Sequence, residues 1–264
     1  MYAGGIEHRR IAPRASTAST VSALFIDERD RDLLAVAIPR PEVHIVARFG
    51  PKTRGGLDVH ALGVREKVHR KRLLSGQRAV TARLQLGAPE AVLGVRASVL
   101  AGHIVALEDL WGITATQQLF DRLAGARDLV EAAAILESAI GERAARADAP
   151  RSPARLSLDA ARRLTGNPVN AVARDLGVSA RHLRRVFREN VGVSPKTFAK
   201  LARFDRALRG AREGARRNWA EIAADAGYYD QAHLIAEFRS ISGVTPQTLL
   251  GELRAARAQT KGTG

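Results

Sequence analysis

A short sequence pattern occurs twice in the C-terminal half of this chain of 264 residues. Ile222-Ala-Ala-Asp-Ala-Gly227 repeats Val172-Ala-Arg-Asp-Leu-Gly177 at an offset of 50 residues. After the glycine the offset is 51, and it relates five identical pairs: Leu183 and Leu234, Phe187 and Phe238, Gly192 and Gly243, Val193 and Val244, Pro195 and Pro246. One extra residue in a turn of the second copy explains why the offset changes from 50 to 51. Repetition on this scale indicates one supersecondary unit used twice.

Each unit predicts two helices joined by a glycine turn. In the first unit, Pro168 suits the first turn of a helix that runs to Leu176, and Gly177 supplies the positive φ that ends it. Ser179 then caps a second helix from Ala180 to about Asn190, and Asp230 takes the same place in the second unit. Helix, glycine turn, helix is the plan of the helix-turn-helix motif, whose second helix enters the major groove of DNA.

The predicted second helix of the first unit has an apolar face and a cationic face. The inward positions follow helical spacing: Leu183, Val186, Phe187 and Asn190. The outward positions form a stripe at steps of three and four: Arg181, Arg184, Arg185 and Arg188, with His182 beside them. Arginine binds guanine O6 and N7 with two hydrogen bonds and also holds phosphates, so the stripe favours DNA recognition over a merely solvated face.

The second unit keeps the scaffold and loses the stripe. Its positions matching Arg181, Arg184 and Arg185 hold Ala232, Ile235 and Ala236. The remaining polar candidates are Gln231, His233 and Arg239. Small apolar side chains contact at most thymine methyl groups. We therefore expect the first unit to specify sequence and the second mainly to position the protein.

Between the units, helical spacing of apolar residues predicts a linker helix from Lys196 to about Arg212. A helix of that length spans ~25 Å at 1.5 Å per residue. With the added width of the motifs, it suits two recognition helices about one DNA turn (~34 Å) apart.

Charge is concentrated in the same half of the chain. Residues 151–264 hold 21 Lys and Arg against 10 Asp and Glu, a net charge of +11, whereas the whole chain carries +15. This excess indicates a polyanionic partner, although an arginine-rich proteome is the alternative explanation. The absence of cysteine excludes disulfides, thiolate zinc sites and thiol catalysis. No signal peptide or membrane span is expected, and we place the protein in the cytoplasm.

The N-terminal half predicts a different structure. Alternating apolar residues indicate strands at 43–49 and 80–86, and a third at 57–61. A helical period follows from 114 to 145. The expected fold class is thus α+β, with a small β-sheet or barrel and two helices, then an all-α domain of two helix-turn-helix units joined by a linker helix.

The expected boundaries follow from composition. Residues 1–22 are interpreted as a disordered leader, 23–147 as an effector-binding or dimerisation domain, and 148–156, with two prolines, as a linker. The DNA-binding domain covers 157–254, with Ser157 capping its first helix, and 255–264 form a tail.

Three further groups of polar or charged residues occur in the first half of the chain. His44, His60, His69 and His103 lack a tight metal-binding spacing, so neither a metal nor another cofactor is expected. The basic run Lys67–Arg72 is interpreted as a solvated loop or strand end, with contact to DNA or an anionic ligand as the alternative. Glu108, Asp109 and Trp111 are interpreted as a helix cap, with a pocket lining as the alternative.

The region 157–250 resembles the C-terminal DNA-binding domain of AraC/XylS-type bacterial transcription regulators. The resemblance lies in Ser179-Ala-Arg-His-Leu-Arg-Arg-Val-Phe187, Gly192-Val-Ser-Pro195, and Ile222 through Gly227 to Gly243-Val-Thr-Pro246. By position it implies DNA contacts from Arg181, Arg184, Arg185, Gln231, Ala232, His233 and Ala236. Members of the family often have Arg where Ala236 stands. A looser resemblance of the first half to an N-terminal domain of some members implies a sensing or dimerisation domain.

These observations predict a sequence-specific transcription regulator that is not an enzyme. Its expected partners are double-stranded DNA, RNA polymerase, a small-molecule effector and a second copy of the chain. The alternative is an architectural DNA-binding protein that tolerates any sequence, and discrimination of ~10³ or more would separate the two. Catalysis is not expected, because no Ser-His-acid set or Gly-rich phosphate loop occurs.

Overall fold

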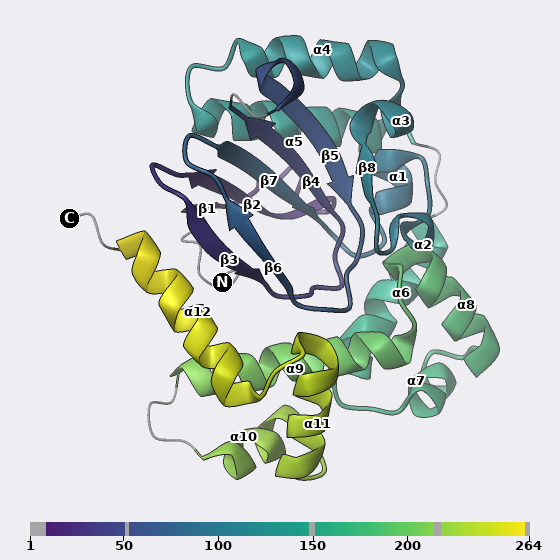
Figure 1. Ribbon diagram of the computed structural model, residues 1–264. Coiled ribbons are helices and arrows are strands. Elements are labelled where there is room, and N and C mark those ends of the chain that lie inside the picture. Colours follow the sequence, from purple (N-terminus) through teal and green to yellow (C-terminus); the bar gives the residue numbers. More distant parts are fainter. Residues whose placement is uncertain (1–8, 51–52, 148–150, 214–217, 262–264) are drawn as a thin grey trace.

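The computed structural model describes residues 9–50, 53–147, 151–213 and 218–261 (Figure 1). A β-sheet covered by helices forms the N-terminal part, and helices alone form the C-terminal part. The predicted α+β class is confirmed.

The main sheet has six antiparallel strands in the order β1-β2-β7-β4-β5-β8. Their bounds are β1 (Arg9–Ile11), β2 (Val21–Glu28), β7 (Arg78–Leu84), β4 (His44–Phe49), β5 (Leu57–Leu62) and β8 (Ile104–Ala106). β3 (Leu33–Ala37) and β6 (His69–Leu73) pair with each other as a separate antiparallel ribbon. The six-stranded sheet does not close into a barrel, so the sheet is the correct one of the two predicted forms.

Helices cover one face of the sheet (Figure 1). The two predicted ones are α4 (Ile113–Ala124) and α5 (Leu129–Ala145). Three short helices precede them: α1 (Pro89–Leu93), α2 (Ala97–Leu100) and α3 (Leu107–Trp111), and a 3₁₀ turn lies at Arg54–Gly56. The covered face is apolar, because Ile45 and Ala47 of β4 and Val80 and Ala82 of β7 are fully buried.

The N-terminal segment differs from the prediction. Residues 1–8 of the expected disordered leader lie outside the described residues, but β1 and the start of β2 fall within it. The turn between these strands is anchored to α5. The carboxylate of the buried Glu137 accepts hydrogen bonds from Thr17 Oγ1 and, at 2.7 Å, from the Arg14 backbone N–H. A buried carboxylate needs such donors, and this long-range requirement left no local signal in the sequence.

The helical part runs from α6 to α12. The bounds are α6 (Arg151–Leu164), α7 (Val169–Asp175), α8 (Ala180–Val191), α9 (Pro195–Glu213), α10 (Trp219–Ala226), α11 (Gln231–Ser242) and α12 (Pro246–Lys261). None of the helices in the described part of the chain has the length and apolar character needed to span a membrane.

The predicted linker and its cap need correction. Residues 148–150 lie outside the described residues, but α6 already begins at Arg151, and Ser157 is buried inside it. Ser157 Oγ donates to the Pro153 carbonyl oxygen at 3.0 Å and is not an N-cap. Pro153 is tolerated because it lies in the first turn, where backbone N–H groups have no partner within the helix. The expected tail is also helical up to Lys261, and 262–264 lie outside the described residues.

Candidate nucleic-acid interface

Both repeated units have the predicted helix-turn-helix geometry. Gly177 and Gly227 adopt φ values of 67° and 84°, in the left-handed region that ends the first helix of each unit. Ser179 Oγ accepts from the His182 backbone N–H at 3.1 Å, and Asp230 Oδ1 accepts from the His233 backbone N–H at 2.7 Å. The two predicted N-caps are confirmed, and they fix where α8 and α11 begin.

The predicted cationic stripe lies on the solvent side of α8. All five of its members are exposed: Arg181, His182, Arg184, Arg185 and Arg188. The opposite face is buried through Leu183, Val186, Phe187 and Asn190, as expected. Within the stripe, Arg184 Nη2 donates to Asn170 Oδ1 at 3.2 Å, and Arg185 Nη1 lies 3.3 Å from a carboxylate oxygen of Glu189. Exposed contacts of this kind contribute little, so these arginines are available to another anion.

An open groove of about 760 Å³ runs along this stripe. Its cationic lining consists of Arg184, Arg185, Arg188 and Lys196, the last at the start of α9. Ser98 and Val99 of α2 form the N-terminal part's share of the wall. The lining also includes Glu189, Val169, Ser194 and Pro195, so the groove is cationic along α8 with one carboxylate beside the arginines.

The second unit presents a weaker surface. The predicted residues of α11 are all exposed: Gln231, Ala232, His233, Ala236 and Arg239. An acidic side chain lies beside them, since Glu237 Oε2 is 3.7 Å from His233 Nε2 and 2.7 Å from Arg203 Nη2. With one arginine, no cationic stripe and a nearby carboxylate, this face attracts phosphate less strongly than α8.

Two neighbouring tyrosines of the second unit have opposite environments. The side chain of Tyr228 is buried, and this burial, together with Glu237, raises the pKa of its phenol. Tyr229 is 93% exposed in the turn directly before α11. Sequence reasoning did not select Tyr229 as a site residue, although its place in the turn, one residue before the cap Asp230, was visible in the repeat.

The linker helix α9 contacts both units. Arg206 donates to the Ala226 carbonyl oxygen at the end of α10 and to the Thr165 carbonyl oxygen just after α6, each at 3.2 Å. Both acceptors lie at helix ends, since Ala226 is the last residue of α10 and Thr165 directly follows α6. Carbonyl groups at such ends have no partner within the helix. The predicted linker helix is therefore present and extends one residue further at each end than expected.

The acidic residues and histidines singled out in the first half of the sequence belong to the N-terminal part. Glu108, Asp109 and Trp111 form part of α3, and the Trp111 indole donates to the Val92 carbonyl oxygen at 2.9 Å. The four histidines considered as a metal site, His44, His60, His69 and His103, are spread over β4, β5, β6 and the turn before β8. The described residues contain no group of three His, Asp or Glu side chains suited to a metal ion.

Two helix-turn-helix units joined by a helix, with a cationic second helix in the first unit, define a DNA-binding domain. Residues 172–252 match the family model described as "Helix-turn-helix domain". The match shows that this C-terminal region is a helix-turn-helix domain, and it agrees with the resemblance of residues 157–250 to the DNA-binding domain of AraC/XylS-type regulators. Among curated proteins, none matches this chain.

Solved structures of regulators show limited similarity to the chain. A DNA-binding transcriptional dual regulator from Escherichia coli K-12 is 21% identical with a TM-score of 0.33, over 42% of this chain and 98% of that one. An AraC-type transcriptional regulator from Chromobacterium violaceum is 22% identical with a TM-score of 0.33, over 44% and 100%. ToxT from Vibrio cholerae is 11% identical with a TM-score of 0.43, over 87% and 97%.

Proposed function

We propose that this protein is a sequence-specific DNA-binding transcription regulator. The carrying observation is the exposed cationic face of α8, which borders an open groove lined by Arg184, Arg185, Arg188 and Lys196. In this proposal α8 lies in a major groove, where Arg181, Arg184 and Arg185 reach base edges or phosphates. Arg188 and Lys196 hold the phosphate backbone at the rim.

The two units contribute unequally in this proposal. α11 enters the next major groove and contacts DNA through Gln231, His233 and Arg239, while Ala232 and Ala236 lie against thymine methyl groups. Tyr229, exposed at the start of α11, is added here as a phosphate or sugar contact. Because α11 has fewer donors than α8, we assign most of the sequence preference to the first unit.

Selection of random-sequence duplexes by the purified full chain at physiological salt tests the proposal. We expect an enriched motif of two elements about one helical turn apart, ~10 base pairs, with the element read by α8 stronger than the other. Binding of all duplexes with similar affinity would instead support the architectural function, which the net charge of +15 and the weak second face favour.

Replacing residues of the weaker face provides a smaller test. Gln231→Ala is expected to lower affinity for the selected duplex by less than ~1 kcal/mol, because the second unit mainly positions the protein and a neutral side chain there makes less than the full bidentate base contact that is worth ~1 to 3 kcal/mol. Competition binding against duplexes altered in the second element measures this effect. A loss comparable to that of removing an arginine of α8 would contradict the assigned imbalance.

We also propose that the N-terminal part responds to a small effector. Burial lowers the pKa of Lys71 in the β3–β6 ribbon, and the charges of Arg29, Arg65 and Arg48 lower it further. The same causes, burial and nearby cations, lower the pKa of His69. Two of these cations already have carboxylate partners, since Arg29 pairs with Asp27 and Arg48 with Asp58. The proposed effector is an anionic small molecule, because its binding beside Lys71 and His69 would oppose the charge repulsion that lowers their pKa values.

The remaining partners follow from the regulatory function. A transcription regulator acts in the compartment that holds the chromosome, which for a bacterial chain is the cytoplasm, and acts on RNA polymerase. Two units in one chain already reach two grooves, so a homodimer is proposed only as a means of occupying a longer site. No catalytic step belongs to this function.

A further inference from the structure

The two helix-turn-helix units do not share a hydrophobic core. The first unit belongs to the same core as the six-stranded N-terminal sheet and its helices, whereas the second forms a separate core with most of α9 and with Val36, Ile38 and Val68 of the N-terminal part. Phe198 of α9 lies in the first core and Phe204 in the second. The placement of α11 relative to α8 therefore depends on α9 and on any other segment that contacts both helix-turn-helix units.

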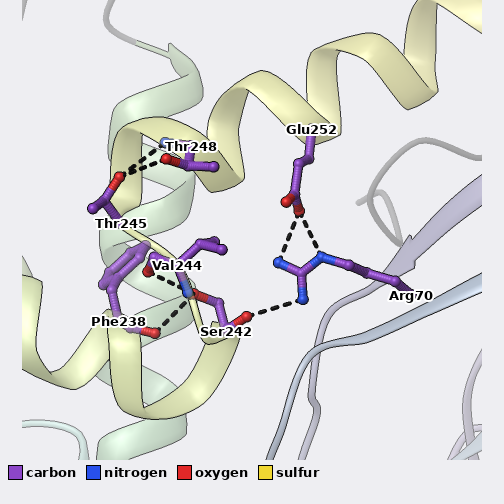
Figure 2. A network of polar contacts seen from close by, with 7 residues as sticks. All are labelled: Arg70, Phe238, Ser242, Val244, Thr245, Thr248 and Glu252. Carbon is purple, nitrogen blue, oxygen red and sulfur yellow. Dashed lines mark hydrogen bonds and ion pairs between the residues drawn. The ribbon is translucent and has the colours of Figure 1, made fainter.

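One segment of the N-terminal part binds the end of α11. Its backbone N–H at Val68 donates to the Ile241 carbonyl oxygen at 2.9 Å, and Lys67 Nζ donates to the Ser240 carbonyl oxygen. Arg70 Nη1 donates to the Ser242 carbonyl oxygen at 2.9 Å. Figure 2 shows Arg70 reaching from its strand to this carbonyl and to Glu252.

These contacts satisfy a specific need of the helix. The last carbonyl groups of an α-helix have no partner within it, and cations near them are favourable. Three successive carbonyls of α11 are bound in this way. Arg70 also pairs with Glu252 of α12 at 2.9 Å. This one side chain therefore connects β6 to α11 and to α12.

The same segment begins at the corresponding end of α8. Gly192 ends α8 with a φ of 90°, and it corresponds to Gly243 at the end of α11. A Cβ added at Gly192 would lie 3.2 Å from Val64 Cγ2 and 3.0 Å from the Ala97 carbonyl oxygen, so backbone and N-terminal part are in close contact there. Arg96 adds an ion pair to Glu189 of α8 at 3.3 Å.

We propose that the segment from Val64 to Arg70 sets the position of α11 relative to α8, and with it the spacing between the two DNA elements that the protein recognises. It touches equivalent ends of the two recognition helices and connects two units that have separate cores. Lys67 and Arg70 are positioning residues, because they act through α11 and not on DNA. The inference rests on the proposed DNA-binding function.

The number of base pairs between the two DNA elements strictly determines where the second recognition helix must lie. Inserting one base pair moves the second groove by ~3.4 Å along the axis and turns it by about 35° around it. A rigid pair of helices cannot follow that change, whereas a pair released from the segment can adjust. Loss of the contacts should therefore alter tolerance to spacing and leave base preference within each element unchanged.

The first experiment measures helix placement without DNA. Arg174→Cys and Ala224→Cys place spin labels at equivalent exposed positions of α7 and α10, and the chain has no other cysteine. Double electron–electron resonance should give a narrow distance distribution in the otherwise unchanged chain and a clearly broader one with Lys67→Ala and Arg70→Ala. Arg72→Ala and Arg78→Ala together serve as the control, since they also remove two exposed cations from the N-terminal part, and Arg72 pairs with Asp32 of that same part at 3.0 Å.

The second experiment measures binding to the selected motif with base pairs inserted or deleted between its elements. We expect the parent chain and the control to lose ~10-fold or more for one inserted base pair, and the Lys67/Arg70 variant to lose less than ~3-fold. If that variant is unfolded in a thermal scan, Arg70→Gln, which keeps most of the side-chain volume, replaces it.

The outcomes separate this inference from the function on which it rests. If the parent chain enriches no motif, the proposed function fails, and the label distances alone decide the positioning. An unchanged distance distribution in the Lys67/Arg70 variant overturns the inference, as does an unchanged spacing profile in a chain that does select a motif. A broader distance distribution together with a greater tolerance to inserted base pairs in the Lys67/Arg70 variant supports the inference.

Discussion

Arg185→Ala is expected to weaken binding to the selected DNA by ~1 to 3 kcal/mol and to relax base preference at one position of the first element. Arg185 lies in the middle of the exposed stripe of α8 and lines the groove beside it. In the free protein it faces Glu189 at 3.3 Å with 59% of its side chain exposed. An exposed pair of this kind contributes little, so the arginine exchanges it for a base edge at small cost.

Competition binding at several salt concentrations measures this effect. Arg174→Ala is the matched control, because Arg174 is an exposed arginine of α7 in the same unit and outside the stripe. We expect the control to change affinity equally for all duplexes and only slightly, as the loss of one distant cation does. Retained affinity and unchanged base preference in Arg185→Ala would contradict the proposal that α8 recognises the DNA sequence.

The features that the sequence predicted well are local and repeated. Glycine turns, N-caps and inward positions depend on residues within a few positions of each other, and the repeat presents each of them twice. Ser179 and Asp230 were assigned as caps for this reason, and both accept the expected backbone hydrogen bond. The exposed and buried faces of α8 followed from spacing alone.

The features that the sequence did not predict depend on distant partners. β3 and β6 pair across more than thirty residues, α12 packs against β3, and β6 is a highly charged and mostly exposed strand. Lys67 and Arg70 were interpreted as part of a solvated loop or strand end, because nothing near them in the sequence reveals the carbonyls of α11. The first residues of α6 were assigned to a linker because Pro153 is a helix breaker everywhere except in a first turn.

The candidate site shows the same division. Spacing placed Arg181, Arg184 and Arg185 on one exposed face, and the structure agrees. It did not place Ser98 and Val99 of α2 at the wall of the same groove, since that contact joins segments about ninety residues apart. The side chains of a recognition helix are thus readable from sequence, whereas their surroundings depend on the packing of the two parts.

Phe204→Ala is expected to lower the free energy of unfolding of the second unit by ~3 to 5 kcal/mol, the largest effect of a single substitution in this chain that we predict. Phe204 of α9 is fully buried, and its ring lies 4.5 Å from that of Phe238 in α11. Removing the ring leaves a cavity at the centre of the second core, where neither α9 nor α11 is free to collapse into it.

The separation of the two cores gives this variant a distinct signature. The six-stranded sheet, its helices and the first unit share a core that does not include Phe204, so their stability should change little. Only Val36, Ile38 and Val68 of the N-terminal part belong to the core that contains Phe204. Heating the variant is expected to give two transitions, with the second unit unfolding first. DNA binding at a temperature between them should retain the preference for the first element and lose that for the second.

Tyr229→Ala is the matched control for stability, because it removes an aromatic side chain from the same unit at a position 93% exposed. Its free energy of unfolding should change by less than ~0.5 kcal/mol, as for most surface substitutions. A single transition in Phe204→Ala, with both elements lost together, would show that the two units fold as one body despite their separate cores. Two transitions would mean that α9 transmits little stability from one helix-turn-helix unit to the other. Each unit would then be stabilised by its own core.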